Sequence, residues 1–135
     1  MLQLMANPRE FTALPVREAL FKFGGAYFSI LENPAAVRLM RLVVSEAARR
    51  PHVAELFNEI GPNRVVRFLA GYFEAQMDAG VLRRSDPALA ARCFMGPLVM
   101  FVITRVVFRN REALETDPSA MLESAVDVFL RGLEV

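Results

Sequence analysis

Apolar residues recur at helical spacing along most of the chain, and prolines separate one periodic segment from the next. Apolar side chains at i, i+3, i+4 and i+7 form one face of an α-helix. The pattern predicts six helices, at residues 15–32, 35–50, 51–60, 62–79, 86–108 and 117–134. A proline stands at or near the start of each, where a missing N–H removes no helical hydrogen bond; they are Pro15, Pro34, Pro51, Pro62, Pro87 and Pro118. We therefore expect an all-α, single-domain helical bundle.

Residues 1–14 stand apart, because their hydrophobic periodicity is weak and Asn7-Pro8 interrupts them. We interpret them as either the tail of a helix that begins upstream or a frayed leader. Residues 15–135 then make up the folded domain.

The segment Asp86–Phe108 is the most apolar in the chain, and its only charged residues after the first turn are Arg92 and Arg105. A helix that is apolar on nearly all sides has no face to present to water. A membrane span is not expected, because Pro97 and Arg105 limit an apolar run that is already too short for a bilayer. A buried strand would suit Leu98–Ile103, but the helical spacing before it favours a helix. We expect this helix to pack within the bundle on one side and against a second copy on the other.

Composition narrows the possible functions. The net charge of +1 gives no sign of a polyanion-binding surface. Cys93 is the only cysteine and His52 the only histidine, so neither an internal disulfide nor a cysteine-based metal site is expected. The sequence contains no nucleophile-elbow, phosphate-loop or zinc-protease motif, and its start does not resemble a secretory signal. We expect a cytoplasmic protein that is not an enzyme, with no catalytic residue, metal, cofactor or membrane partner.

Large, soft apolar side chains are frequent, with 11 Phe and 7 Met in a chain that is 54% hydrophobic. Such a content favours an obligate oligomer, because homodimer interfaces resemble a core cut in half. Phe and Met at helical spacing form either a filled core or the lining of an adaptable pocket. In the second case Tyr27, Tyr72 and Gln76 are the polar groups that could orient a ligand.

Two glycine positions carry specific expectations. Gly24-Gly25 lies inside the first predicted helix, where the pair lowers helix propensity by about 2 kcal/mol. Such a pair marks close helix packing or a kink, and less often a ligand near the backbone. Gly80 suits the residue after a helix in a Schellman motif, with Val81 or Leu82 packing back on the helix.

A run of motifs between residues 32 and 96 carries a family resemblance. RLVVSEAARRP is followed by ELF and a Gly-Pro break, then by AQMDAGVLR and the pattern D-P-x-L-A-A-R-x-F. This order resembles the C-terminal domain of TetR-family transcriptional regulators, in particular the AefR-like type. The resemblance covers about half of the chain, and the flanking helices fit the architecture without distinctive motifs.

The resemblance implies that the helices enclose an effector pocket and that the last two helices pair with their twins in a four-helix dimer interface. The chain would then be an effector-sensing and dimerisation domain that forms a homodimer and binds a small apolar or amphipathic ligand. The expected ligand-binding residues are Phe23, Tyr27, Met40, Phe57, Phe68, Tyr72, Gln76, Phe94 and Leu98. The expected dimer-interface residues are Phe101, Arg105, Phe108, Leu122, Val126 and Phe129.

One part of the family pattern is missing, because nothing before Leu14 resembles a helix-turn-helix. We therefore expect no specific DNA binding by this chain itself, either because it is a fragment or because the gene lacks the DNA-reading head. The alternative function is that of a headless helical interaction protein that heterodimerises with a full-length regulator.

Overall fold

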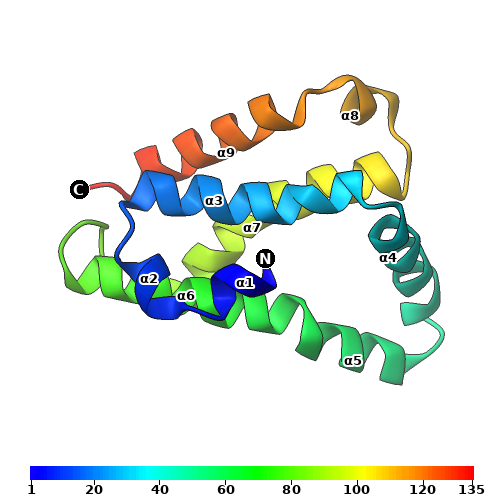
Figure 1. Ribbon diagram of the computed structural model, residues 1–135, viewed down its shortest axis with the longest axis horizontal. Coiled ribbons are helices and arrows are strands. Elements are labelled where there is room, and N and C mark those ends of the chain that lie inside the picture. Colours follow the sequence, from blue (N-terminus) through cyan, green and yellow to red (C-terminus); the bar gives the residue numbers. More distant parts are fainter.

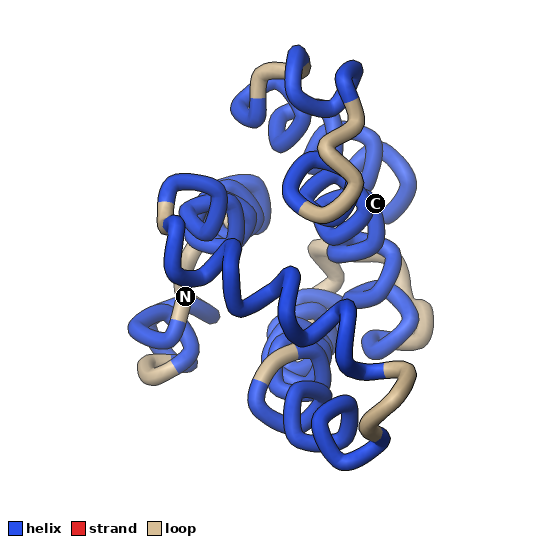
Figure 2. Tube along the Cα trace, turned by 90° about the vertical axis from the view of Figure 1, so that its right-hand side faces the viewer, coloured by secondary structure: helices blue, strands red, loops and turns tan.

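The computed structural model describes the backbone of residues 1–135 and every side chain except that of Leu2. The predicted all-α fold is confirmed (Figure 1). The six long helices are α3 (Val16–Phe28, continued by the 3-10 turn η1, Ser29–Glu32), α4 (Pro34–Ala47), α5 (Pro51–Ile60), α6 (Pro62–Asp78), α7 (Pro87–Val106) and α9 (Pro118–Leu133). Three short helices are additional: α1 (Leu2–Met5), α2 (Pro8–Thr12) and α8 (Arg111–Glu115). The end-on view in Figure 2 shows helices and loops only.

The helix starts follow from local sequence. Five of the long helices have proline at their first position. At three of these starts the side chain of the preceding residue, Asn33, Asp86 or Asp117, accepts hydrogen bonds from backbone N–H groups of the first turn. These N–H groups have no partner within the helix, so each cap stabilises its start by about 1 kcal/mol. Pro15 differs, because it is the residue before α3 rather than its first helical residue.

Helix α7 runs through the middle of the bundle. It packs most extensively on α6 and also contacts α9 and α3. Eight of its residues are buried, including Phe94, Leu98 and Val102. Other apolar residues of the same helix stay exposed: Leu89 at 58% and Met100 at 63%. By length and composition alone α7 could cross a membrane, but the core helix of a soluble protein passes the same test.

The end of α6 is the predicted Schellman motif. Gly80 has φ +77°, a backbone conformation that glycine adopts without strain. Its N–H donates to the carbonyl oxygen of Met77 at 3.1 Å, and the N–H of Val81 donates to that of Gln76 at 3.0 Å. Leu82, rather than Val81, supplies the buried apolar contact, with 1% of its surface exposed. The motif directs the chain from α6 into α7.

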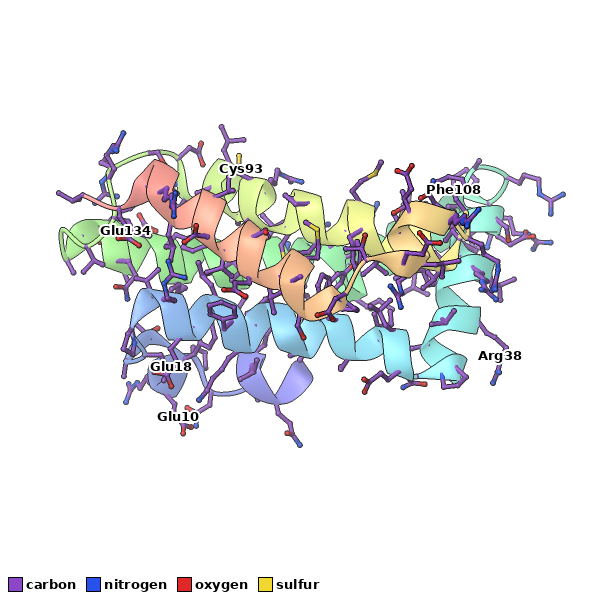
Figure 3. All side chains as sticks on the ribbon, turned by 90° about the horizontal axis from the view of Figure 1, so that it is seen from above. Glu10, Glu18, Arg38, Cys93, Phe108 and Glu134 are labelled. Carbon is purple, nitrogen blue, oxygen red and sulfur yellow. The ribbon has the colours of Figure 1, made fainter. Side chains whose placement is uncertain are left out.

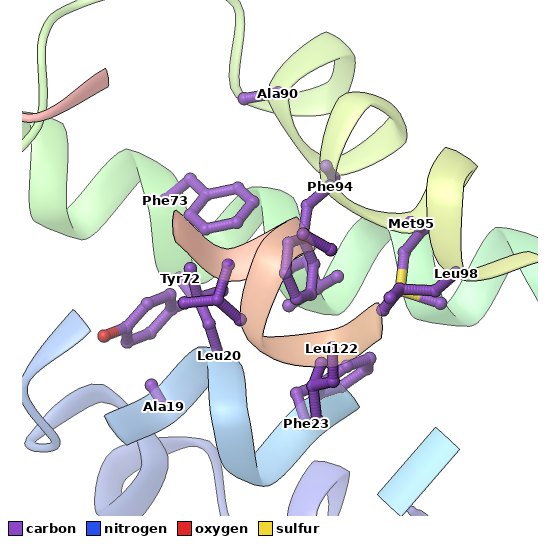
Figure 4. Close-up of a cluster of buried hydrophobic side chains, with 14 of the residues drawn as sticks. Ala19, Leu20, Phe23, Tyr72, Phe73, Ala90, Phe94, Met95, Leu98 and Leu122 are labelled. Carbon is purple, nitrogen blue, oxygen red and sulfur yellow. The ribbon is translucent and has the colours of Figure 1, made fainter. Parts of the chain in front are cut away.

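Helices α3 and α9 approach closely at Gly24. A Cβ atom at this position would lie 2.3 Å from Cδ1 of Leu122, whereas the same atom at Gly25 would meet nothing within 4 Å. Figure 4 shows Leu122 of α9 beside Phe23 of α3, within the cluster of buried side chains. Of the roles expected for the glycine pair, close helix packing applies to Gly24.

The two glycines provide a matched pair of substitutions. Gly25→Ala should stabilise the protein by about 1 kcal/mol, because alanine favours the helix and the added methyl group meets open space. Gly24→Ala gains the same propensity but displaces Leu122, and such overpacking costs about 1–3 kcal/mol. Urea unfolding of the two variants should therefore rank Gly25→Ala above Gly24→Ala by at least about 1 kcal/mol. Equal stabilisation by both would show that the α3–α9 contact is not tight.

Candidate effector site and dimer face

Three of the expected ligand-binding residues lie together in the interior. The rings of Phe23 on α3 and Phe68 on α6 stack at a centroid distance of 5.7 Å, with an interplanar angle of 17°. Tyr72 lies one helical turn after Phe68 on α6 and is 3% exposed. A fourth ring, that of Phe11, completes this aromatic cluster of Phe11, Phe23, Phe68 and Tyr72.

Phe11 belongs to α2, within the segment that the sequence left as a leader or helix tail. Its ring centroid is 4.9 Å from that of Tyr72, 5.1 Å from that of Phe68 and 6.1 Å from that of Phe23. These distances lie in the range of favourable aromatic pairs. Sequence reasoning missed this residue, and the only available signal was a phenylalanine in a stretch whose hydrophobic periodicity is weak.

Two of the three polar groups expected to orient a ligand, Tyr72 and Gln76, bond to the backbone of residues 12–14. The Tyr72 hydroxyl donates to the carbonyl oxygen of Leu14 at 3.1 Å. Nε2 of Gln76, one turn further along α6, donates to the carbonyl oxygen of Thr12 at 3.4 Å. Both donors therefore face the N-terminal segment rather than an open cavity.

Tyr27, Met40 and Phe57 lie on three different helices, α3, α4 and α5, and all three are half-buried. Tyr27 and Met40 pack against the edge of the core. None of the hydrogen bonds found among the described side chains involves the Tyr27 hydroxyl. Burial raises the pKa of Tyr27 to about 12, because the phenolate would lose hydration. The hydroxyl therefore stays protonated at neutral pH and is available as a donor.

Phe94 and Leu98, the last two expected ligand-binding residues, belong to the core around α7. Phe94 is 1% exposed and Leu98 is fully buried. The Phe94 ring packs edge-on against Phe129 of α9, at 5.4 Å between centroids. The structure thus places Phe94 and Leu98 in the same hydrophobic core cluster as Phe23 and Tyr72.

Helices α4 and α5 form the least buried wall of the bundle. Neither helix has a fully buried residue. Apolar side chains on both remain exposed, among them Leu39 at 59% and Leu56 at 64%. One long-range bond connects α4 to the bundle's central helix: Nε of Arg41 donates to the carbonyl oxygen of Val106, at the end of α7, at 2.6 Å. This bond also gives an α7 terminal carbonyl group a partner.

The expected dimer-interface residues mostly face inward. Phe101, Leu122 and Val126 are 6%, 8% and 0% exposed, and they belong to the core of the single chain. The Phe129 ring packs on Phe73 and Phe94. Only Phe108, at 70%, is widely exposed. Figure 3 shows it on the same side of the molecule as Cys93, opposite Glu10 and Glu18.

Arg105 has a role within the chain. Its Nη1 donates to the carbonyl oxygens of Ala113 at 2.9 Å and Thr116 at 3.0 Å. Its guanidinium carbon also lies 5.8 Å from the ring centroid of Phe101. Arg105 therefore ties the connection through α8 to the end of α7.

A groove of about 630 Å³ lies on the outer surface between α7 and α9. Helix α7 contributes Leu89, Cys93 and Pro97 at intervals of four residues, which places them on one face. Helix α9 contributes Met121, Val128 and Gly132. Val128 is 73% exposed. We name this surface the α7–α9 groove; it is lined mainly by apolar side chains and lies outside the core.

Comparison with known proteins supports the fold and identifies the family. A putative TetR-family regulator from Mesorhizobium loti MAFF303099 matches 99% of this chain over 69% of its own, with 20% identity and a TM-score of 0.78. A TetR-family regulator from Pseudomonas syringae pv. tomato str. DC3000 matches 99% of this chain over 70% of its own, with 22% identity and a TM-score of 0.71. The Flavonoid-responsive Regulator FrrA matches 98% of this chain over 72% of its own, with 26% identity and a TM-score of 0.68.

A search of curated proteins gave no match. The family model described as the C-terminal domain of AefR-like transcriptional repressors matches residues 18–132. This match extends well beyond the motifs between residues 32 and 96 and covers most of α3 and α9 and all of α8. The chain therefore belongs to the TetR family of transcriptional regulators, through an AefR-like C-terminal domain.

Proposed function

We propose that this domain senses a small apolar or amphipathic effector, forms a homodimer, and so controls DNA binding by a helix-turn-helix outside these 135 residues. The observation that carries the proposal is the separation of two apolar surfaces. One is the aromatic cluster inside the bundle, and the other is the α7–α9 groove on the outside. An effector would use the first and a second copy of the chain the second.

The α7–α9 groove suits an interface between identical chains. A two-fold axis brings the same surface of both copies together, so α7 and α9 of each would form a four-helix arrangement. Leu89, Met100 and Val128 would then leave water, and each buried apolar side chain of this size contributes about 1.5–3 kcal/mol. The large exposed apolar side chains of α7 and α9 thereby gain a partner.

The effector that we propose is aromatic. Phe23, Phe68 and Tyr72 offer ring faces and edges, which favour planar aromatic molecules. FrrA, which shares 26% identity with this chain, is named as flavonoid-responsive. A flavonoid-like phenol would combine ring contacts in the cluster with a hydrogen bond to a tyrosine such as Tyr27.

Control of DNA binding requires that the effector bind one packing of the helices better than another. The shift between two conformations is limited by the difference in affinity for them. The lightly buried α4–α5 wall can change position with little loss of buried area, and Arg41 links it to the end of α7. We propose that this link transmits effector binding to the dimer face.

The dimer face can be tested by placing a charge in the groove. Val128→Asp should give a folded monomer, because each copy would bring an unpaired carboxylate into the interface. Val44→Asp, at an exposed position on α4, is the matched control and should remain dimeric. Sedimentation velocity measures whether each variant is a monomer or a dimer, and circular dichroism measures whether it keeps its helices.

An aspartate at Val126, two residues before Val128 and on the inward side of α9, distinguishes a residue of the core from a residue of the interface. Val126 is fully buried within the chain, so Val126→Asp should unfold the protein rather than dissociate it. A dimeric Val128→Asp variant, or a well-folded monomeric Val126→Asp variant, would contradict the assignment of the two faces.

The burial of the two tyrosines predicts how the stability of the folded chain depends on pH. Burial raises the pKa of both Tyr27 and Tyr72 from 10.0 to about 12. The unfolded chain therefore loses these protons at lower pH than the folded chain. The resulting stability is fully present below pH 10 and is lost as the pH rises toward 12.

A spectroscopic titration follows the phenolate absorbance of these two tyrosines, which are the only ones in the chain. In the folded protein we expect both tyrosines to ionise near pH 12. In the Tyr27→Phe variant only Tyr72 remains, so the change in absorbance should be half as large and should keep the same midpoint pH. Ionisation of the folded protein near pH 10 would show that the hydroxyls are well hydrated.

A further inference from the structure

We propose that Phe11 is an internal plug: its ring occupies the subsite for an aromatic ring of the effector, and effector binding expels it and releases residues 1–14. The inference rests on the proposed function and adds to it a defined subsite, a ligand class and a conformational response. The aromatic cluster is the starting point, because the expected effector residues that meet there already contact a phenyl ring supplied by the chain itself.

The Phe11 ring lies among the three other rings of the aromatic cluster. Phe11 is 2% exposed and contacts rings on three sides, from Phe23, Phe68 and Tyr72. It packs edge-on to Tyr72, at an interplanar angle of 66°, and tilted to Phe68, at 55°. The three partner rings come from α3 and α6 and remain in place if α2 leaves. Removal of Phe11 would therefore leave a subsite of the size and chemistry of one benzene ring.

Two hydrogen bonds join α6 to the segment that carries Phe11. Tyr72 and Gln76 donate to backbone carbonyl oxygens of Leu14 and Thr12, and both of these acceptors belong to the same segment as Phe11. When that segment leaves, two neutral donors lose their acceptors next to the emptied subsite. The matching ligand is a neutral aromatic molecule with a carbonyl or phenolic oxygen near the ring.

One side chain is the most deeply buried attachment of the N-terminal segment. Helices α1 and α2 have four and five residues, too short to be stable alone. Among the described side chains of residues 1–14, Phe11 is the only one that is fully buried, whereas Met1, Leu4, Met5 and Leu14 pack against the core and stay partly exposed. A ligand that replaces the buried ring and both hydrogen bonds therefore competes with the most deeply buried contact of the segment.

The test uses acetophenone, which combines one ring with one carbonyl acceptor, and benzoate as its charged counterpart. Hydrogen exchange of the unmodified chain is measured at saturating acetophenone. We expect slower exchange in α3 and α6 and at least tenfold faster exchange across residues 1–14. Benzoate should produce neither change at the same concentration. Bound acetophenone that leaves residues 1–14 unchanged, or protects them, would overturn the proposal.

Substitution of the plug provides the second readout. Phe11→Ala should bind acetophenone at least tenfold more tightly than the unmodified chain, because no ring competes for the subsite. Phe28→Ala is the matched control: Phe28 is 7% exposed and packs on Phe101, outside the aromatic cluster. This control should bind no more tightly than the unmodified chain. If Phe11→Ala does not fold, Phe11→Leu replaces it, with at least a threefold gain expected from the smaller plug.

The outcomes separate this proposal from the function on which it rests. Weaker binding by both Phe11 variants would show that Phe11 is a structural residue, and effector sensing could then use the Tyr27 region. Chemical-shift changes confined to Tyr27 and Met40 would likewise overturn the plug but retain the effector site. Absence of acetophenone binding to the unmodified chain and to both variants, in a protein that still dimerises, would overturn the plug and the aromatic effector together.

Discussion

The fold is organised around the burial of α7. This helix is apolar nearly all the way round, and one chain covers only part of it, through α6, α9 and α3. The uncovered residues, including Leu89 and Met100, belong to the same rigid element as the core residues Phe94 and Leu98. Any partner on the outer face is therefore coupled to the packing inside. In a regulator this coupling is useful, because an effector and a dimer partner would act on opposite sides of one helix.

The remaining elements differ in how firmly they are attached to α7. Helix α9 packs closely on α3 at Gly24, and Arg105 fixes the connection that leads to α9. By contrast, α4 and α5 have no fully buried residue, and Phe11 is the one fully buried side chain among those described in the N-terminal segment. Elements with few buried contacts open at lower free energy than the core. The domain thus combines a well-buried body of α3, α6, α7 and α9 with two less buried parts, the α4–α5 pair and the N-terminal segment.

Much of the fold could be predicted because its signals are local. Proline, capping residues such as Asp86, and the apolar spacing together define the six long helices, and Gly80 defines the end of α6. The short helices α1, α2 and α8 could not be predicted in the same way, because elements of four or five residues depend on tertiary contacts. Phe11 illustrates this limit: its importance arises from rings more than ten residues away in sequence.

The candidate sites were less predictable than the helices that carry them. Phe23, Phe68 and Tyr72 were expected together among the ligand-binding residues, and the structure brings their rings into one cluster. Periodicity alone could not show which neighbouring helix each face would meet. Leu122 and Val126 share the inward stripe of α9, whereas Val128, two residues further on, points outward. An apolar stripe on a helix predicts that its residues are buried, whether in the core of one chain or in an interface between two chains. Only the packing of the other helices shows which of the two applies.

Sedimentation equilibrium of the unmodified protein at micromolar concentration shows whether a second copy of the chain covers the outer face of α7. If it does, we expect a single species with twice the chain mass of 15.1 kDa. A stable, folded species of 15.1 kDa would contradict it, because the exposed apolar stripe of α7 would then face water.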